Sequence, residues 1–124
     1  DMEVGNHWRI GNARQIVDEL TKIKGKYGDI PVFLMGDFNS TSAHDPYSIL
    51  TEYFDDSLTV ASEYRSQPMA TFHTVGQAPA DGGLPLDYIF VSKNSAQIVS
   101  CEIICDKDMI DSTDHLAVIT RAEL

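Results

Sequence analysis

Three short stretches of the sequence carry residue types that could do chemistry, and the first of them follows an apolar run. In "GDFN", at 36–39, Asp37 and Asn39 stand two positions apart. Residues i and i+2 of a strand project to the same face, so both side chains are expected at the carboxyl end of a buried strand, where ligands of open α/β sheets bind. A carboxylate there needs a cation, a hydrogen-bond donor or water as its partner. The alternative is a simple turn, since Gly-Asp and Asn-Ser both favour turns.

The other two stretches supply an imidazole and a second carboxylate. "STDHLAVI", at 112–119, places Asp114 and His115 just before a predicted strand. An adjacent carboxylate and imidazole offer a contact for a metal or phosphate and a group that titrates near neutral pH; a capping segment with an incidental histidine is the alternative. Asp87, in "LDYIFVS", is the one charge in an otherwise apolar strand and needs a partner, for which an imidazolium is the natural choice. An Asp that orients a His is a recurring catalytic device.

The elements that position these residues follow from the spacing of apolar side chains. Helical spacing predicts a helix over 10–23, with Trp8 packing its start against the sheet. The continuous apolar run at 30–35 predicts a strand that is covered on both faces. A second helix is predicted near Asp45, which is placed to cap it, with Pro46 in the first turn.

Strands are predicted for much of the second half of the chain. Alternating patterns and β-branched residues indicate three strands, at 86–92, 96–105 and 116–124, and a weaker one at 70–75. The segment at 76–85 is predicted to be a loop because it is rich in glycine and proline. Helices followed by strands suggest layered α/β packing.

Length, composition and charge narrow the classes of function. The chain has 124 residues, enough for one domain at most, and no apolar segment long enough to span a membrane. Its net charge is -10 and its nine Lys and Arg are scattered, so it shows no basic track for nucleic acid. Excess carboxylates fit a divalent-cation site, although a solvated acidic surface explains most of them. Cys101 and Cys105, four apart in a predicted strand, are too distant for a disulfide and are expected to be buried free thiols.

Together, the three stretches resemble the C-terminal half of the endonuclease/exonuclease/phosphatase superfamily, the metal-dependent phosphoesterases related to DNase I. The family's GDFN motif matches 36–39, its [LI]DYIF motif matches 86–90, and its SDHxPV motif corresponds to "TDHLAV" at 113–118, in the same order and with similar spacing. The helical "NARQI" at 12–16 and "TFH" at 71–73 also resemble segments of the family. In the last motif, Thr and Ala replace the family's Ser and Pro.

The resemblance implies an α/β (α+β) fold that is half of a four-layer α/β sandwich, with one mixed or antiparallel sheet and helices on one face. Residues 1–124 would then form a partial domain, the C-terminal half, without the N-terminal half. A lone half exposes an apolar sheet face and a strand edge. It is therefore expected to pair with its missing half, to form a homodimer through the exposed sheet, or to aggregate.

The resemblance also implies roles for individual residues. Asp37 would orient or deprotonate the attacking water and share in metal binding, and Asn39 would hold oxygens of the scissile phosphate. His115 would stabilise the transition state or act as acid/base, with Asp87 fixing its orientation. Asp114 would contribute to the metal site.

The function implied is that of a divalent-metal-dependent phosphoester hydrolase, using Mg²⁺ or Mn²⁺. His73 is a further candidate, for a substrate contact, with a satisfied edge-strand histidine as the alternative. The main Glu ligand of the metal is expected upstream of residue 1, so the chain alone is expected to be weak or inactive. The substrate is a small molecule, a lipid head group or nucleic acid, and the acidic composition favours the first two. The alternative is a non-catalytic binding or scaffold module that retains the fold.

Overall fold

The strands of this chain form two small sheets rather than one. The computed structural model describes residues 2–124, and its elements in chain order are α1 (Met2–Tyr27), β1 (Phe33–Asp37), α2 (Asp45–Leu50), β2 (Phe54–Asp56), α3 (Ser57–Val60), β3 (Tyr64–Arg65), β4 (Asp87–Ser92), β5 (Gln97–Ile104), α4 (Lys107–Ser112) and β6 (Ala117–Glu123). The first sheet has the order β1-β4-β2 and the second the order β3-β5-β6. All pairs are antiparallel except β3 with β5. The α/β class is confirmed, but the single sheet is wrong, because the short connection after β4 carries the chain across to the second sheet.

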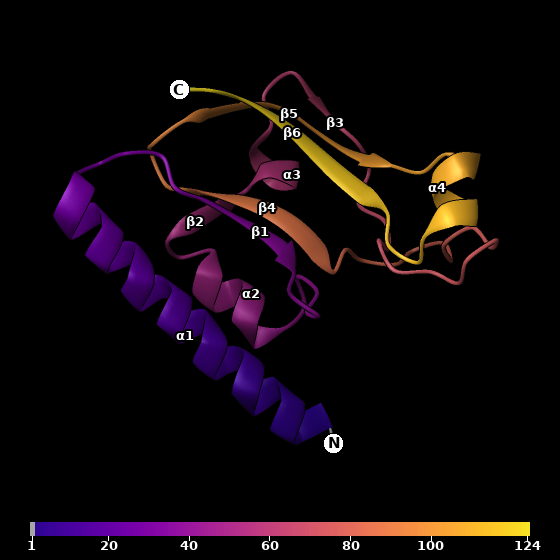
Figure 1. Ribbon diagram of the computed structural model, residues 1–124, viewed down its shortest axis with the longest axis horizontal. Helices are drawn as coiled ribbons and strands as arrows, with labels where there is room; N and C mark the ends of the chain where they lie inside the picture. The colour runs from indigo at the N-terminus through magenta and orange to yellow at the C-terminus, as the bar shows by residue number, and fades with distance from the viewer. Residues whose placement is uncertain (1) are drawn as a thin grey trace.

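Helices and sheets stack in three layers (Figure 1). α1 and α2 cover one face of the first sheet, with Leu20, Leu50 and Phe90 in the core between them. The second sheet covers the other face, where Val91 of β4 packs with residues of β5. Alternation along β4 therefore turns Tyr88 and Phe90 toward the helices, and turns Asp87 and Val91 toward the second sheet.

The first helix is longer than predicted. It begins at Met2 instead of residue 10 and ends at Tyr27, before Gly28 with φ of 77°. An apolar stripe marks where a helix packs, whereas its backbone hydrogen bonds continue beyond the stripe. The predicted packing of Trp8 against the sheet is wrong, since Trp8 is 66% exposed and its ring meets that of His7 edge-on. Among the described residues, no helix is long and apolar enough to cross a membrane.

The strand before the GDFN motif is covered on both faces only at its start, where Phe33 packs with the core of the second sheet and Leu34 packs with the core under the helices. β1 is the edge of the first sheet, and Met35 on it is 62% exposed. A hollow lined by Met35, Ile89 and Val118 lies between this edge and strand β6 of the second sheet. The continuous apolar run at 30–35 predicts a fully buried strand, but in this structure the strand is only partly buried.

Three local predictions also need correction. His44, not Asp45, is the N-cap of α2, with an extended backbone and no side-chain capping bond, and Pro46 lies in the first turn as predicted. Both thiols are free, but only Cys101 is buried; Cys105 is exposed because β5 has ended before it. The unpredicted helix α4 follows, capped by the side chain of Asp106.

Candidate active site

Two carboxylates face each other across neighbouring strands. Asp37 ends β1 and Asp87 begins β4, and the antiparallel register pairs them directly. Like charges in this position repel each other and destabilise a sheet unless other groups compensate. Compensation comes from a residue outside both strands.

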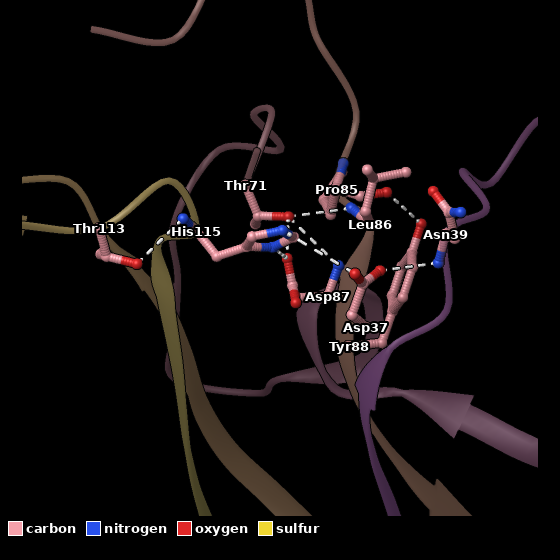
Figure 2. A network of polar contacts seen from close by, with 9 residues as sticks. All are labelled: Asp37, Asn39, Thr71, Pro85, Leu86, Asp87, Tyr88, Thr113 and His115. Atoms are coloured by element: carbon pink, nitrogen blue, oxygen red, sulfur yellow. Dashed lines mark hydrogen bonds and ion pairs between the residues drawn. The ribbon is translucent and has the colours of Figure 1, made fainter. Parts of the chain in front are cut away.

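That residue is His115, in the turn between α4 and β6 (Figure 2). Its Nδ1 lies 2.8 Å from Oδ2 of Asp87, and its Nε2 lies 3.8 Å from Oδ2 of Asp37. Ligand atoms of the three side chains all lie within 4.8 Å of one another. The structure thus brings together three residues that the sequence places at three separate strand ends.

The hydrogen bond with Asp87 sets the state of the imidazole. It is the main cause that raises the pKa of His115, and the nearby charges of Asp37 and Asp114 raise it further. Because a carboxylate only accepts, Nδ1 of His115 must donate. The neutral ring therefore keeps its lone pair on Nε2, on the side of Asp37 and solvent.

Asp37 takes part in a turn and in the site at once. Its Oδ1 accepts a hydrogen bond of 2.8 Å from the backbone N–H of Asn39, while Oδ2 faces His115. Asn39 lies beyond the strand with φ of 50°, a left-handed conformation that asparagine tolerates. Between them, Phe38 packs against Phe90 in the helix-facing core. The two interpretations of this stretch, turn and site, are therefore compatible.

The two remaining sequence candidates lie around this centre and not in it. His73 is only 6% exposed, and its Nδ1 donates toward the carbonyl oxygens of Thr74 at 3.0 Å and Gln77 at 3.2 Å. Its Nε2 has no hydrogen-bond partner among the described residues. The side chain of Asp114 is exposed and lies outside the three-residue cluster, while its carbonyl oxygen accepts from the N–H of His73.

One contributor escaped the sequence reasoning. Thr71 is fully buried, and its hydroxyl lies 2.6 Å from Oδ2 of Asp87. The weak strand predicted around it is absent; only an isolated bridge pairs Phe72 with His115. The signal that could have identified Thr71 is the TFH segment, in which the histidine alone attracted attention.

The free ligand atoms fit a hard divalent cation in part. Oδ2 of Asp87 already accepts from Thr71 and His115, which leaves Oδ2 of Asp37 and Nε2 of His115 open. Mg²⁺ and Mn²⁺ prefer oxygen ligands, and Mg²⁺ is usually held by one or two carboxylates with several waters. The carboxylates of Asp37 and Asp87 fit that pattern as part of a larger ligand set, and an imidazole is also suited to proton transfer or hydrogen bonding.

Comparisons with known proteins agree on one family. Residues 4–115 match the endonuclease/exonuclease/phosphatase family. The chain superposes on a solved member from Bacteroides vulgatus with a TM-score of 0.76 and 31% identity, over 94% of this chain and 44% of that one. A mannosyl-6-phosphatase from Bacteroides thetaiotaomicron superposes with a TM-score of 0.77 at 17% identity, over 94% and 46% of the two chains. No curated protein matches the chain.

A third solved structure has a similar extent. A conserved protein of unknown function from Enterococcus faecalis superposes with a TM-score of 0.72 and 26% identity, over 95% of this chain and 45% of that one. The chain therefore spans just under half the length of these three solved structures.

Proposed function

This chain belongs to the endonuclease/exonuclease/phosphatase family, and from that premise we propose that it is the C-terminal half of a divalent-metal-dependent phosphoester hydrolase. The observation that carries the proposal is the convergence of Asp37, Asp87 and His115 where β1 ends and β4 begins. A pair of carboxylates with an imidazole between them can accept a proton, donate one and bind a cation within one small volume.

Each side chain has a distinct task in the proposed reaction. Asp37 orients the attacking water and takes its proton, and the exposed carboxamide of Asn39 holds a non-bridging oxygen of the phosphate. The hydrogen bond with Asp87 raises the pKa of His115, and the protonated form that it favours donates from Nε2 to an oxygen on which negative charge develops. Asp87 does not meet the substrate; it holds His115 through Nδ1.

The metal proposed is Mg²⁺ or Mn²⁺, with Asp37 as a ligand and Asp114 as a neighbouring carboxylate. Bound there, it would polarise a phosphoryl oxygen and shield the charge of the ester. The principal ligand is proposed to be a Glu in the N-terminal half. Residues 1–124 alone are accordingly proposed to have little or no activity.

The substrate proposed is a small phosphoester or a phosphorylated lipid head group. The net charge of -10, with nine scattered Lys and Arg, offers little attraction to a polyanion. The mannosyl-6-phosphatase among the similar structures makes a sugar phosphate the first compound to assay.

The test is hydrolysis by the full-length protein with Mg²⁺, with Mn²⁺ and with a chelator. Substrates are a bis-aryl phosphate, a sugar 6-phosphate, sphingomyelin and abasic DNA. Asp37→Asn should lower the rate by about 10²-fold or more, since it removes the proton acceptor. Asp18→Asn, an exposed change on α1, is the matched control and should act like the wild type. Inactivity of the wild type on every phosphoester would remove the enzyme proposal and favour a non-catalytic binding module.

The same proposal makes a prediction about assembly. Met35 and Ile119 are 62% and 57% exposed on strands, and the outer edge of β1 is unpaired within the described residues. Residues 1–124 produced alone should therefore dimerise or aggregate, and should form a one-to-one complex when the N-terminal half is supplied. Sedimentation velocity distinguishes these states. A stable compact monomer that binds no hydrophobic dye would contradict the proposed interface.

A further inference from the structure

A buried hydroxyl lies behind the Asp87–His115 pair. Oγ1 of Thr71, on a side chain with no exposed surface, is 2.6 Å from Oδ2 of Asp87 (Figure 2). The backbone N–H groups of Leu86 and Asp87 lie 3.0 and 3.2 Å from the same oxygen. Since an N–H can only donate, both lone pairs of Oγ1 are occupied, and the single hydroxyl proton must go to Asp87.

This contact restrains the carboxylate of Asp87. Rotation of an Asp carboxylate about its last torsion is soft, and Asp37 on the neighbouring strand repels the group. The hydroxyl of Thr71 and Nδ1 of His115 both converge on Oδ2 of Asp87. Two donors on one oxygen define the plane of the carboxylate, and that plane keeps the imidazole in the Nδ1–H tautomer.

The segment around Thr71 also holds the other member of the pair. The carbonyl oxygen of Thr71 accepts a bond of 2.7 Å from the N–H of Leu116, and the N–H of His73 donates to the carbonyl oxygen of Asp114 at 2.9 Å. His115 lies between these two anchored residues. The ring of Phe72 rests against its imidazole, with centroids 5.3 Å apart. One short segment thus touches Asp87 by a side chain and the His115 turn by its backbone.

We propose that Thr71 is a positioning residue: its hydroxyl aligns Asp87 so that His115 donates from Nδ1 and directs Nε2 toward Asp37. The role is indirect, since Thr71 is buried behind Asp87 and is not proposed to contact the substrate. The inference rests on the proposed function for its consequence in catalysis, but the geometric part can be measured without any activity.

The activity test uses three variants of the full-length protein. Thr71→Val keeps the shape and removes the hydroxyl, Thr71→Ser restores it, and Thr120→Val removes a hydroxyl that donates to the thiol of Cys101, away from the site. Thr71→Val should lower kcat about 10- to 100-fold with KM nearly unchanged, as for other outer partners of a site. Thr71→Ser should return kcat to within a few-fold of the wild type, and Thr120→Val should not change it.

The deciding measurement is the ring ¹⁵N spectrum of His115 in metal-free protein, at a pH where the imidazole is neutral. The wild type and Thr71→Ser should show Nδ1 protonated and Nε2 bare, and Thr71→Val should show a mixture of tautomers. A Thr71→Val protein that keeps the wild-type tautomer overturns the proposal, whatever its activity. A wild type without phosphoesterase activity would instead refute the proposed function and leave the tautomer result standing.

A measurement on the wild type keeps the proposal testable if Thr71→Val does not fold. The hydroxyl proton of Thr71 should exchange slowly with solvent and show a nuclear Overhauser effect to the Nδ1 proton of His115, because both point at the same oxygen. A hydroxyl that exchanges as fast as that of the exposed Thr21 would overturn it.

Discussion

Two carboxylates in this protein each accept a hydrogen bond from a buried or half-buried hydroxyl, yet their surroundings differ. Asp56 accepts from the hydroxyl of Tyr47 at 2.9 Å, and its other oxygen accepts from the N–H of Leu58 at 3.0 Å. Asp87 accepts from Thr71 and from the imidazole of His115 on one oxygen. Asp56 is 6% exposed, whereas Asp87 lies at the start of the central strand β4, where the site opens, with a side chain that is 19% exposed.

The two carboxylates differ in the further contacts of the groups that donate hydrogen bonds to them. The donors of Asp56 are a core tyrosine and a backbone N–H, and that buried carboxylate caps α3, where burial raises its pKa. At Asp87 the contacts continue through the imidazole to Asp37 and solvent. The donor–acceptor distance does not distinguish the two hydroxyl–carboxylate hydrogen bonds. What distinguishes them is whether the carboxylate also contacts a group that faces the site, as Asp87 does through His115.

Replacing Asp87 should lower activity far more than replacing Asp56, and this is the largest difference expected between the two carboxylates. Asp87→Asn in the full-length protein removes the charge that supports the protonated imidazole, so kcat should fall about 10²- to 10⁴-fold with little change in melting temperature. Asp56→Asn is the matched control and should leave kcat unchanged. Steady-state kinetics and thermal unfolding of both variants check this, and an activity loss of equal size at Asp56 would erase the distinction.

Removing the other carboxylate should instead cost stability. Asp56→Leu leaves the hydroxyl of Tyr47 and the N–H of Leu58 without an acceptor, at about 1–3 kcal/mol each, so the free energy of unfolding should fall by about 2–5 kcal/mol. Chemical denaturation measures it. Asp55→Leu, next to it in the chain and paired only with Lys93 at the surface, should cost less than about 1 kcal/mol. Equal losses of stability in the two variants would mean that the buried hydrogen bonds of Asp56 contribute no more than the surface ion pair of Asp55.

A smaller change tests the hydroxyl alone. Tyr47→Phe removes one of the two donors of Asp56 while preserving the aromatic packing with Phe90, so the free energy of unfolding should fall by about 0.5–1.5 kcal/mol. Tyr53→Phe, at a 44% exposed ring, is the control and should be neutral. If Tyr47→Phe also lowered kcat, the two regions would be coupled.

The centre of the site could be predicted because each of its residues breaks a local pattern. Asp37 follows an apolar strand, Asp87 interrupts one, and His115 precedes one, so each stands at a strand end where side chains have room to converge. A charge in an apolar strand requires a partner, and that requirement is visible without coordinates.

What surrounds the centre could not be predicted in the same way. Thr71 is an ordinary residue for an extended segment, and its value comes from contacts with Asp87 and Leu116, distant in sequence. The division into two sheets depends on long-range pairing, which alternation of side chains does not encode. Exposure of Met35 depends likewise on which elements cover the edge strand.

The smallest expected effect is a pH dependence of stability that separates Asp56 from the site. Burial raises the pKa of Asp56 above its ordinary value, so the folded state binds its proton more tightly than the unfolded state does. Its contribution to stability is therefore full below the unfolded pKa of about 3.9 and declines as the pH rises through the folded pKa. Asp56→Asn lacks this decline.

Subtraction isolates the effect, because every other group, His115 included, is present in both proteins. The free energy of unfolding of the wild type minus that of Asp56→Asn should decrease as the pH rises from about 3 toward 7, with the wild type favoured most in acid. Urea titrations of both proteins across this range measure the difference. A difference that stayed constant or grew with pH would mean that burial does not disfavour the charged form of Asp56, and this part of the contrast between the two carboxylates would be lost.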